Sequence, residues 1–402
     1  MKIIHLSTEI SAQSAAKRIS DSLNKLKLES KILTLKGEEK FSRNVKYSIV
    51  KKILNQIEYQ FKNKINKNKR IYISLNLSGA NDYKNLEIRN ADIVNIHWIN
   101  GGFFSIDSIK NIKKNIVWTC HDSWPFTGIC HVRNECDNYK NYCENCHLLD
   151  DKNKWIAKKI FNKKKNILSN NNVNFVFPSS AHKNFALNSE IFTNINKDKL
   201  NVIGNPINTN MFYDELYIRN NKIITLGFGA IGGIRNKFKG IDDLKEALKK
   251  MEIGVQLKLI IFGSDEQKEI NELFHDIDVE IINEGYIKNE NELRQIYSSI
   301  DVFISPSIEE SFGQTLAESM ACGCLGVAYN NTGCIDIIDD SINGFLAEYK
   351  NIESLRKSIM KAIKKINLGY DRKISTKSIY YKFNEDKIAT LYFDLYKKIL
   401  KL

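Results

Sequence analysis

Two glutamates separated by seven residues are the sharpest chemical feature of this sequence. Glu310 lies in a loop after an apolar run, and Glu318 lies on the helix expected to follow that loop. Carboxylates bind pairs of hydroxyl groups, and the free amides at a helix N-terminus bind phosphate. The segment therefore predicts a site for an elongated ligand with both groups, such as a nucleotide-sugar. The residues expected near the helix start are Ser311, Phe312, Gly313 and Thr315.

Short apolar strands alternate with helical patterns along the chain, and these elements must position the two glutamates. Lys2–Leu6 begins one such series, and Ile223–Phe228 begins another after Asn205-Pro206. The alternation predicts an α/β protein with two Rossmann-like domains facing each other across a cleft, where ligands bind at the carboxyl ends of the strands. We expect domains over residues 1–206 and 207–384. An amphipathic helix over residues 385–402 is expected to pack back on the first domain.

Composition excludes several classes of protein. The 402 residues are 43% hydrophobic and 27% charged, which is typical of a soluble globular protein. No apolar run reaches the ~18 residues that a membrane-spanning helix needs. The segment from Met1 to Ser7 lacks the apolar length and the cleavage site of a signal peptide. We therefore expect a cytoplasmic protein.

The positive charge is concentrated in the first half of the chain. Of a formal net charge of +13, residues 1–206 carry +16 and residues 207–402 carry −3. This asymmetry suggests that one half meets a polyanion, either nucleic acid or the anionic face of a membrane. A lysine-rich solvated surface is the alternative explanation.

The segment around the two glutamates resembles the E-x7-E signature of glycosyltransferase family 4, whose members are retaining enzymes with the GT-B fold. Gly227–Ala230 followed by Phe238–Gly240 resembles the phosphate-binding loop of that family, and Asn343–Leu346 resembles its NG-x-L turn. Asn95–Phe103 and Thr119–Gly128 resemble a subgroup close to the colanic-acid transferases of exopolysaccharide synthesis. The resemblance implies transfer of a sugar from a UDP- or GDP-sugar to a saccharide or lipid-linked saccharide in bacterial surface polysaccharide synthesis.

The resemblance also implies roles for individual side chains. Glu310 would hold the hydroxyls of the donor sugar, Glu318 would hold the ribose, and His121 would contact the donor sugar from the N-terminal domain. The first loop, Ile10–Ala15, lacks the pair of glycines that relatives usually have. We therefore expect acceptor binding at this loop to differ from that of relatives.

Two cations are expected beside the donor diphosphate. By the same resemblance, Lys239 would neutralise the diphosphate next to the backbone of Gly229, with Arg235 as the second cation and Lys237 as its alternative. Fixed cations stabilise the charge that builds on a departing diphosphate. Because these groups handle the diphosphate and no D-x-D pair follows a strand, no catalytic divalent metal is expected.

Four cysteines within 17 residues predict a structural metal site. Cys130, Cys136, Cys143 and Cys146 have the pattern C-x5-C-x6-C-x2-C, and the last pair has the spacing that chelates tetrahedral zinc. Ordinary buried thiols are one alternative, and replacement of a thiol ligand by His131 or His147 is another.

Two other functions remain open from the sequence. A nucleotide-sugar epimerase shares the two-domain architecture, and a nucleic-acid-binding protein would explain the basic half. Nucleic-acid binding has no motif to support it, so we expect no nucleic-acid partner. We expect the basic half to hold the enzyme on the inner face of the cell membrane, where lipid-linked acceptors lie.

Overall fold

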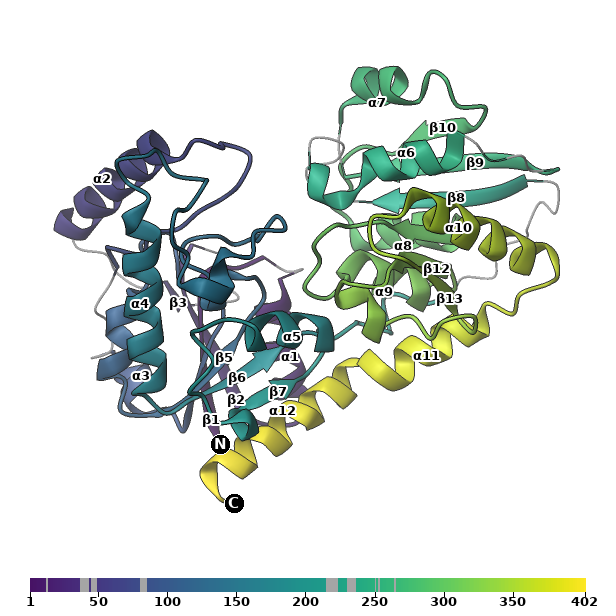
Figure 1. The fold of residues 1–402 in the computed structure, drawn as a ribbon. Helices are drawn as coiled ribbons and strands as arrows, with labels where there is room; N and C mark the ends of the chain where they lie inside the picture. Colours follow the sequence, from purple (N-terminus) through teal and green to yellow (C-terminus); the bar gives the residue numbers. More distant parts are fainter. Residues whose placement is uncertain are drawn as a thin grey trace. The chain divides into compact units, whose positions relative to one another are not determined.

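The computed structural model describes residues 1–11, 14–36, 43–44, 49–79, 85–214, 223–229, 236–249, 251, 254–263 and 265–402. The chain divides into two compact units. Unit 1 comprises Met1–Pro206 and Ile388–Leu402, and unit 2 comprises Ile207–Lys387. Each unit is built on its own parallel sheet with helices around it (Figure 1). This arrangement confirms the predicted α/β class with two Rossmann-like sheets.

The sheet of unit 1 has the strand order β3-β2-β1-β4-β5-β6-β7, and every neighbouring pair is parallel. Strands β4 and β6 are buried along their whole length, as expected for parallel strands covered on both faces. The order reverses between β1 and β4, and such a reversal is where open α/β sheets bind ligands. The strands are β1 (Lys2–Glu9), β2 (Glu29–Lys36), β3 (Arg43–Asn44), β4 (Ile93–Ile96), β5 (Asn115–Thr119), β6 (Val173–Phe177) and β7 (Leu200–Val202).

The helices of unit 1 begin where polar side chains satisfy free backbone amides. Ser14 accepts a hydrogen bond from the Lys17 amide at the start of α1, and Ser179 accepts one from the His182 amide at the start of α5. The α-helices along this part of the chain are α1 (Ala15–Lys25), α2 (Ile49–Ile65), α3 (Leu86–Arg89), α4 (Trp155–Ser169) and α5 (Ser180–Leu187).

The last helix, α12 (Glu385–Leu400), packs on unit 1. Tyr392 and Tyr396 are fully buried. The Asn95 side-chain amide donates a hydrogen bond to the Tyr396 hydroxyl at 2.8 Å, and the Thr119 hydroxyl lies 3.2 Å from that of Tyr392. The expected return of the C-terminal helix to the first domain is therefore confirmed.

The sheet of unit 2 has the strand order β10-β9-β8-β11-β12-β13 and is also entirely parallel. Its order reverses between β8 and β11, at the same topological position as in unit 1. The strands are β8 (Ile223–Gly229), β9 (Gln256–Phe262), β10 (Glu280–Asn283), β11 (Val302–Ser305), β12 (Leu325–Tyr329) and β13 (Gly344–Ala347). The helices are η7 (Lys237–Lys239), α6 (Ile241–Lys249), α7 (Gln267–Phe274), α8 (Glu290–Ser299), α9 (Gln314–Ala321), α10 (Ile352–Asn367) and α11 (Lys373–Phe383).

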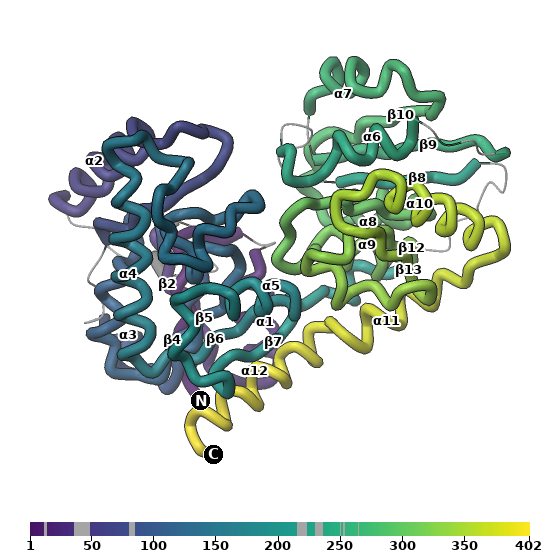
Figure 2. Tube along the Cα trace, in the orientation of Figure 1, coloured from purple at the N-terminus to yellow at the C-terminus, as the bar shows by residue number. Residues whose placement is uncertain are grey.

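Helix α2 is unusual because most of its side chains are exposed. Only Lys62 and Ile65 are buried on it, whereas apolar side chains such as Ile49 and Ile53 are 76% and 55% exposed. Figure 2 shows the helix at the margin of unit 1. Lys62 lies in the last turn of α2, and its ammonium group lies over the Tyr72 ring, 4.4 Å from the centroid.

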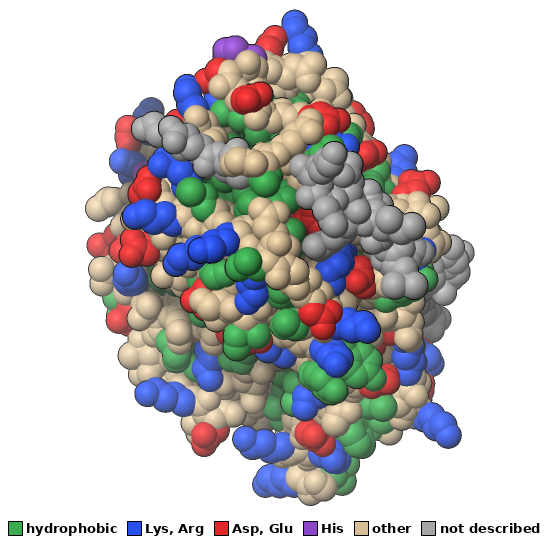
Figure 3. All heavy atoms as spheres, turned by 90° about the vertical axis from the view of Figure 1, so that its right-hand side faces the viewer, with side chains coloured by type: hydrophobic (Ala, Val, Ile, Leu, Met, Phe, Trp, Pro, Cys, Tyr) green, Lys and Arg blue, Asp and Glu red, His purple; other side chains and the backbone are tan. Residues whose placement is uncertain are grey.

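The described helices include none that is both long and apolar enough to cross a membrane. On the face shown in Figure 3, basic and acidic side chains are interspersed rather than gathered into one patch of a single sign.

Candidate functional site

In unit 2, two glycines bring the backbone together at the β8/β11 reversal. A Cβ atom on Gly229 would lie 2.1 Å from the Phe262 ring, so only glycine fits at the end of β8. Gly240 has φ +75°, and a Cβ atom there would lie 1.9 Å from the Pro306 carbonyl oxygen. The Ile308 amide also donates to the Phe238 carbonyl at 2.8 Å. These contacts hold η7 against the loop that carries Glu310.

This close approach pairs Lys239 with Glu310. The Lys239 ammonium lies 2.6 Å from a Glu310 carboxylate oxygen, and the two side chains are 27% and 17% exposed. Desolvation by itself would lower the pKa of Lys239, but the Glu310 carboxylate raises it above its ordinary value. The lysine therefore stays positively charged in a half-buried position, where a charged group interacts strongly with a ligand.

Helix α9 begins beside this ion pair. Gly313 precedes the helix with φ +111°, and a Cβ atom there would lie 2.9 Å from the Cys334 sulfur. Phe312 is buried, and its ring meets the Phe383 ring edge-on at 5.1 Å. Ser311 and Thr315 lie on either side of the helix start and are partly exposed. The first amides of α9 and the Lys239 ammonium can therefore serve one anionic ligand.

Glu318 lies one helical turn further and is only 4% exposed. The Gln314 amide donates to one of its carboxylate oxygens at 2.9 Å, and the Tyr297 hydroxyl donates to the other at 3.4 Å. Burial and this carboxylate hold the pKa of Tyr297 well above its ordinary value, so the hydroxyl remains a donor. Gln314 and Tyr297 were not identified from the sequence, although Gln314 lies four residues before Glu318.

The second cation is the least defined part of this site. Arg235 lies outside the described residues. Lys237, its alternative, is 65% exposed, and its ammonium is 4.0 Å from the carboxylate of Asp242.

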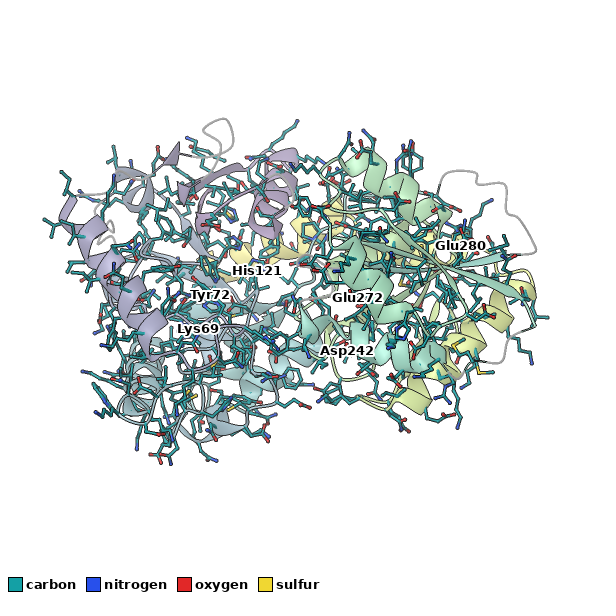
Figure 4. The ribbon with its side chains drawn as sticks, turned by 90° about the horizontal axis from the view of Figure 1, so that it is seen from above. Lys69, Tyr72, His121, Asp242, Glu272 and Glu280 are labelled. Carbon is teal, nitrogen blue, oxygen red and sulfur yellow. The ribbon has the colours of Figure 1, made fainter. Side chains whose placement is uncertain are left out.

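In unit 1, three histidines form a hydrogen-bonded chain: His5 lies on β1, and His97 and His121 lie just after the neighbouring strands β4 and β5. Nδ1 of His5 lies 2.8 Å from Nε2 of His97, and Nδ1 of His97 lies 2.8 Å from Nε2 of His121. The rings stack with centroids 5.1 Å apart in both pairs. His121, labelled in Figure 4, lies at the end of this chain. The sequence analysis identified only His121.

Burial keeps the three imidazoles neutral. Desolvation lowers the pKa of His5 to about 3, that of His121 to about 4, and that of His97 well below its ordinary value. Nε2 of His5 is buried and has no hydrogen-bond partner among the described residues. A lone pair is less costly to leave unpaired than an N–H group. This favours donation from His5 to His97 to His121, which leaves the His121 proton on Nδ1.

A second histidine network lies beside the first. One Asp122 carboxylate oxygen lies 2.6 Å from Nδ1 of His131, and Nε2 of the same ring lies 2.8 Å from the Ser74 hydroxyl. Burial tends to raise the pKa of Asp122, but His131 and the Trp124 amide hold it below its ordinary value. The His131 ring therefore links the Asp122 carboxylate to the Ser74 hydroxyl.

The structure does not support the predicted zinc site. Among the described residues, which include all four cysteines of the cluster, no group of three or more histidine, cysteine, aspartate or glutamate side chains is arranged to hold a metal ion. Burial raises the pKa values of the four thiols, and that of Cys143 reaches about 12. The Cys143 sulfur instead accepts a hydrogen bond from the Gly128 amide at 3.1 Å. The four cysteines of this prediction are Cys130, Cys136, Cys143 and Cys146, of which all but Cys136 are buried.

Comparison with known proteins agrees with the fold. Residues 228–377 match the sequence family described as "Glycosyl transferases group 1". A glycosyltransferase structure from Rickettsia africae superposes with a TM-score of 0.65 at 18% identity, covering 100% of this chain and 99% of that one. Anabaena HepE in complex with UDP gives 0.62 at 13% identity, covering 99% and 100%. These matches support the GT-B fold.

Two curated relatives are similar to this chain in sequence over less than half of its length. The N,N'-diacetylbacillosaminyl-diphospho-undecaprenol α-1,3-N-acetylgalactosaminyltransferase of Campylobacter jejuni is 24% identical over 168 residues, which are 40% of this chain and 42% of that protein. The capsular polysaccharide biosynthesis glycosyltransferase CapM of Staphylococcus aureus is 26% identical over 185 residues, 43% of this chain and 48% of the relative. The chain thus spans less than half the length of these relatives. Together the matches support a transferase enzyme.

Proposed function

We propose that the protein is a retaining glycosyltransferase that binds a nucleoside diphosphate sugar on unit 2 and a saccharide or lipid-linked saccharide acceptor on unit 1. The Lys239–Glu310 pair at the start of α9 carries the proposal, because it joins a cation, helix amides and a hydroxyl acceptor at the β8/β11 reversal. Glu310 would hold sugar hydroxyls. Glu318 would hold the ribose after exchanging its contacts with Gln314 and Tyr297.

The reaction is a transfer at the anomeric carbon of the donor. The bond from that carbon to the diphosphate breaks, and its electron pair leaves with the diphosphate. An acceptor hydroxyl attacks from the same face, and its proton passes to the departing phosphate oxygen. Lys239 and the first amides of α9 would stabilise the charge on the leaving group.

His121 would contact the donor sugar as a neutral hydrogen-bonding group. Its pKa of about 4 keeps it uncharged near neutral pH. A neutral imidazole can donate or accept a hydrogen bond with a sugar hydroxyl. His97 and His5 would fix the orientation and the tautomer of this ring.

We also assign the E-x7-E element to family 4 and the acceptor-side segments to the colanic-acid subgroup, as part of surface polysaccharide synthesis. The names of the two curated relatives, one acting on a lipid-linked saccharide and one in capsule synthesis, support this direction. The UDP complex of a structural neighbour supports a nucleotide-sugar donor.

Helix α2 supports binding to the inner face of an anionic membrane. Ile49, Val50 and Ile53 are 76%, 66% and 55% exposed, and the exposed Lys52 follows on the same helix. Apolar side chains insert between lipids while lysines contact anionic headgroups. A larger fraction of the protein should sediment with phosphatidylglycerol vesicles than with phosphatidylcholine vesicles. Val50→Asp should lower the fraction that sediments with phosphatidylglycerol vesicles. Equal sedimentation with both lipids would contradict the membrane proposal.

The donor site is tested by nucleotide binding. Thermal unfolding with UDP-, GDP-, ADP- and CMP-sugars should show stabilisation by one nucleotide class. Glu310→Gln should abolish turnover of that donor while preserving the fold, and Glu309→Gln, one residue earlier in the loop, should retain turnover. If no nucleotide stabilises the protein, or if Glu310→Gln turns over normally, the proposed function is wrong.

A further inference from the structure

A polar cavity lies at the β1/β4 reversal of unit 1, apart from the donor site. Its volume is about 250 Å³. Thr8 and Glu9 reach it from β1, Trp98 and Gly101 from the loop after β4, and α2 closes one side. Drug-sized ligands occupy ~300–1,000 Å³, so this cavity suits a smaller group, of the size of one sugar ring.

The lining of this cavity has the chemistry that binds sugars. Three aromatic side chains (Tyr59, Tyr72 and Trp98) offer flat apolar faces for the C–H face of a sugar ring. The carboxylates of Glu9 and Glu58 and the amides of Asn55 and Gln56 are suited to pairs of hydroxyl groups.

Several walls of the cavity are already fixed in place. The Tyr72 ring, labelled in Figure 4, lies 5.0 Å from the His131 ring and carries the Lys62 ammonium on its face. The Ser74 hydroxyl lies 2.8 Å from Nε2 of His131, which holds it at the cavity wall, where it can bind a ligand hydroxyl. The Thr8 hydroxyl donates to the Trp98 carbonyl at 2.9 Å and so holds the loop that carries the indole. A site fixed in this way loses little entropy when a ligand binds.

An apolar groove adjoins the cavity. It has a volume of about 500 Å³ and includes Leu54, Ile57, Phe61 and Leu77, which are between 36% and 56% exposed. Glu58 lines both the cavity and the groove, so the two share the same stretch of α2. Each also includes one lysine, Lys62 in the cavity and Lys51 in the groove.

We propose that the cavity and the groove together bind one amphiphile, a saccharide joined to a hydrocarbon chain. The sugar ring lies against Tyr59, Tyr72 and Trp98, and the chain lies along Leu54, Ile57 and Leu77. The two lysines suit an anionic group that joins the two parts. This inference rests on the proposed function, because it assigns the acceptor of that transfer as the lipid-linked form rather than a free saccharide.

Binding of glycosides to the full chain without nucleotide tests this assignment. Calorimetry would first compare the methyl glycosides of glucose, galactose, mannose, N-acetylglucosamine and N-acetylgalactosamine. It would then compare the best of them with its octyl counterpart below the micelle concentration. We expect the octyl compound to bind at least about tenfold more tightly, because full burial of two methylenes already supplies that factor.

Matched variants separate the two parts of the site. Tyr72→Leu should lose both glycosides, whereas Tyr286→Leu in unit 2, where the tyrosine is equally exposed at 48%, should bind both normally. Ile57→Gln should remove most of the advantage of the octyl chain. Ile53→Gln should keep it, because Ile53 is also 55% exposed on the same helix but lies outside the groove. Tyr59→Leu provides a second cavity variant if Tyr72→Leu unfolds.

Failure of this inference is distinct from failure of the proposed function. No glycoside binding, no advantage of the octyl chain, or equal effects of the two isoleucine variants would overturn the acceptor assignment, whatever nucleotides do. Absence of nucleotide binding would overturn the proposed function while leaving the glycoside measurements valid.

Discussion

The two units place their candidate sites at the same reversal in strand order but build them from opposite chemistry. Unit 2 presents a charged pair, Lys239 and Glu310, at the edge of the β8/β11 reversal. Unit 1 presents neutral, buried imidazoles from His5, His97 and His121 beside the β1/β4 reversal. A charge at a half-exposed position suits an anionic ligand, whereas neutral donors and acceptors suit an uncharged one with hydroxyl groups. The comparison teaches that one topology can present either a charged pair or neutral hydrogen-bonding groups, which suit anionic groups and sugar hydroxyls respectively.

The largest effect is expected from removing the charge in unit 2. Lys239→Met should lower kcat by about 10²–10³-fold, the usual cost of losing one fixed group that stabilises developing charge. Its effect on stability should be small, about 1 kcal/mol or less, because the pair is partly exposed. Steady-state kinetics and urea unfolding measure the two effects. Lys268→Met, at a lysine of unit 2 whose side chain is 86% exposed, is the control, and equal losses in both variants would contradict the special position of Lys239.

In unit 1 we expect a larger effect on stability than the one that Lys239→Met has in unit 2. His97→Phe keeps a ring but removes both hydrogen bonds of the chain, leaving ring nitrogens of His5 and His121 unpaired. The free energy of unfolding should fall by about 2–4 kcal/mol. Urea unfolding measures this loss, and His275→Phe, at an exposed histidine, should have little effect. A loss of stability no larger than that of the control would show that the three hydrogen-bonded histidines are not needed for folding.

The backbone of unit 2 offers a way to disturb the ion pair without touching either charge. Gly240→Ala places a methyl group against the Pro306 carbonyl at a positive φ, which should cost about 2 kcal/mol or more. Nucleotide affinity should fall with it, because Lys239 is the preceding residue. Gly254→Ala is the matched control, since no atom lies within 4 Å of its added methyl group. Normal nucleotide binding by Gly240→Ala would mean that nucleotide affinity does not depend on the position of the segment that carries Lys239.

The response to pH is a further comparison, and its sign differs between the units. The pKa values of His5 and His121 are lowered, to about 3 and about 4, so the unfolded chain takes up more protons below pH 6.5. Stability should therefore fall on acidification, approaching ~1.4 kcal/mol per pH unit for each histidine. Lys239 has a raised pKa, so its contribution persists at neutral pH and is lost as pH rises through that pKa.

Thermal unfolding at pH 8, 6.5 and 5.5 measures the acid response. His5→Asn retains a hydrogen-bonding amide near the position of Nδ1 but does not titrate. The stability of this variant should therefore fall less steeply on acidification. An unchanged slope would mean that other groups cause the loss of stability.

The sequence was most informative where the chemistry is local. Glu310, Gly313 and Glu318 lie within nine consecutive residues, so their spacing alone predicts a loop and a helix start. The apolar runs Lys2–Leu6 and Ile223–Phe228 similarly predicted the parallel sheets. Such features depend on neighbours along the chain, and a single sequence records them directly.

The sequence was least informative where distant segments meet. His5 and His97 are 92 residues apart, and nothing in their spacing predicts that they share a hydrogen bond. The cysteine spacing suggested a metal site, which the arrangement of the described residues does not support. The cavity beside α2 combines Glu9, Tyr59 and Trp98 from three separate segments.

The sequence by itself therefore determined the α/β class, the E-x7-E element and the uneven charge of the two halves. Only the tertiary structure decided that Lys239 meets Glu310, that three histidines stay neutral, and that a polar cavity adjoins an apolar groove. The physical reason is that hydrophobic periodicity and helix capping act over a few residues. Burial, which sets pKa values and the shapes of cavities, depends on segments brought together by the whole fold.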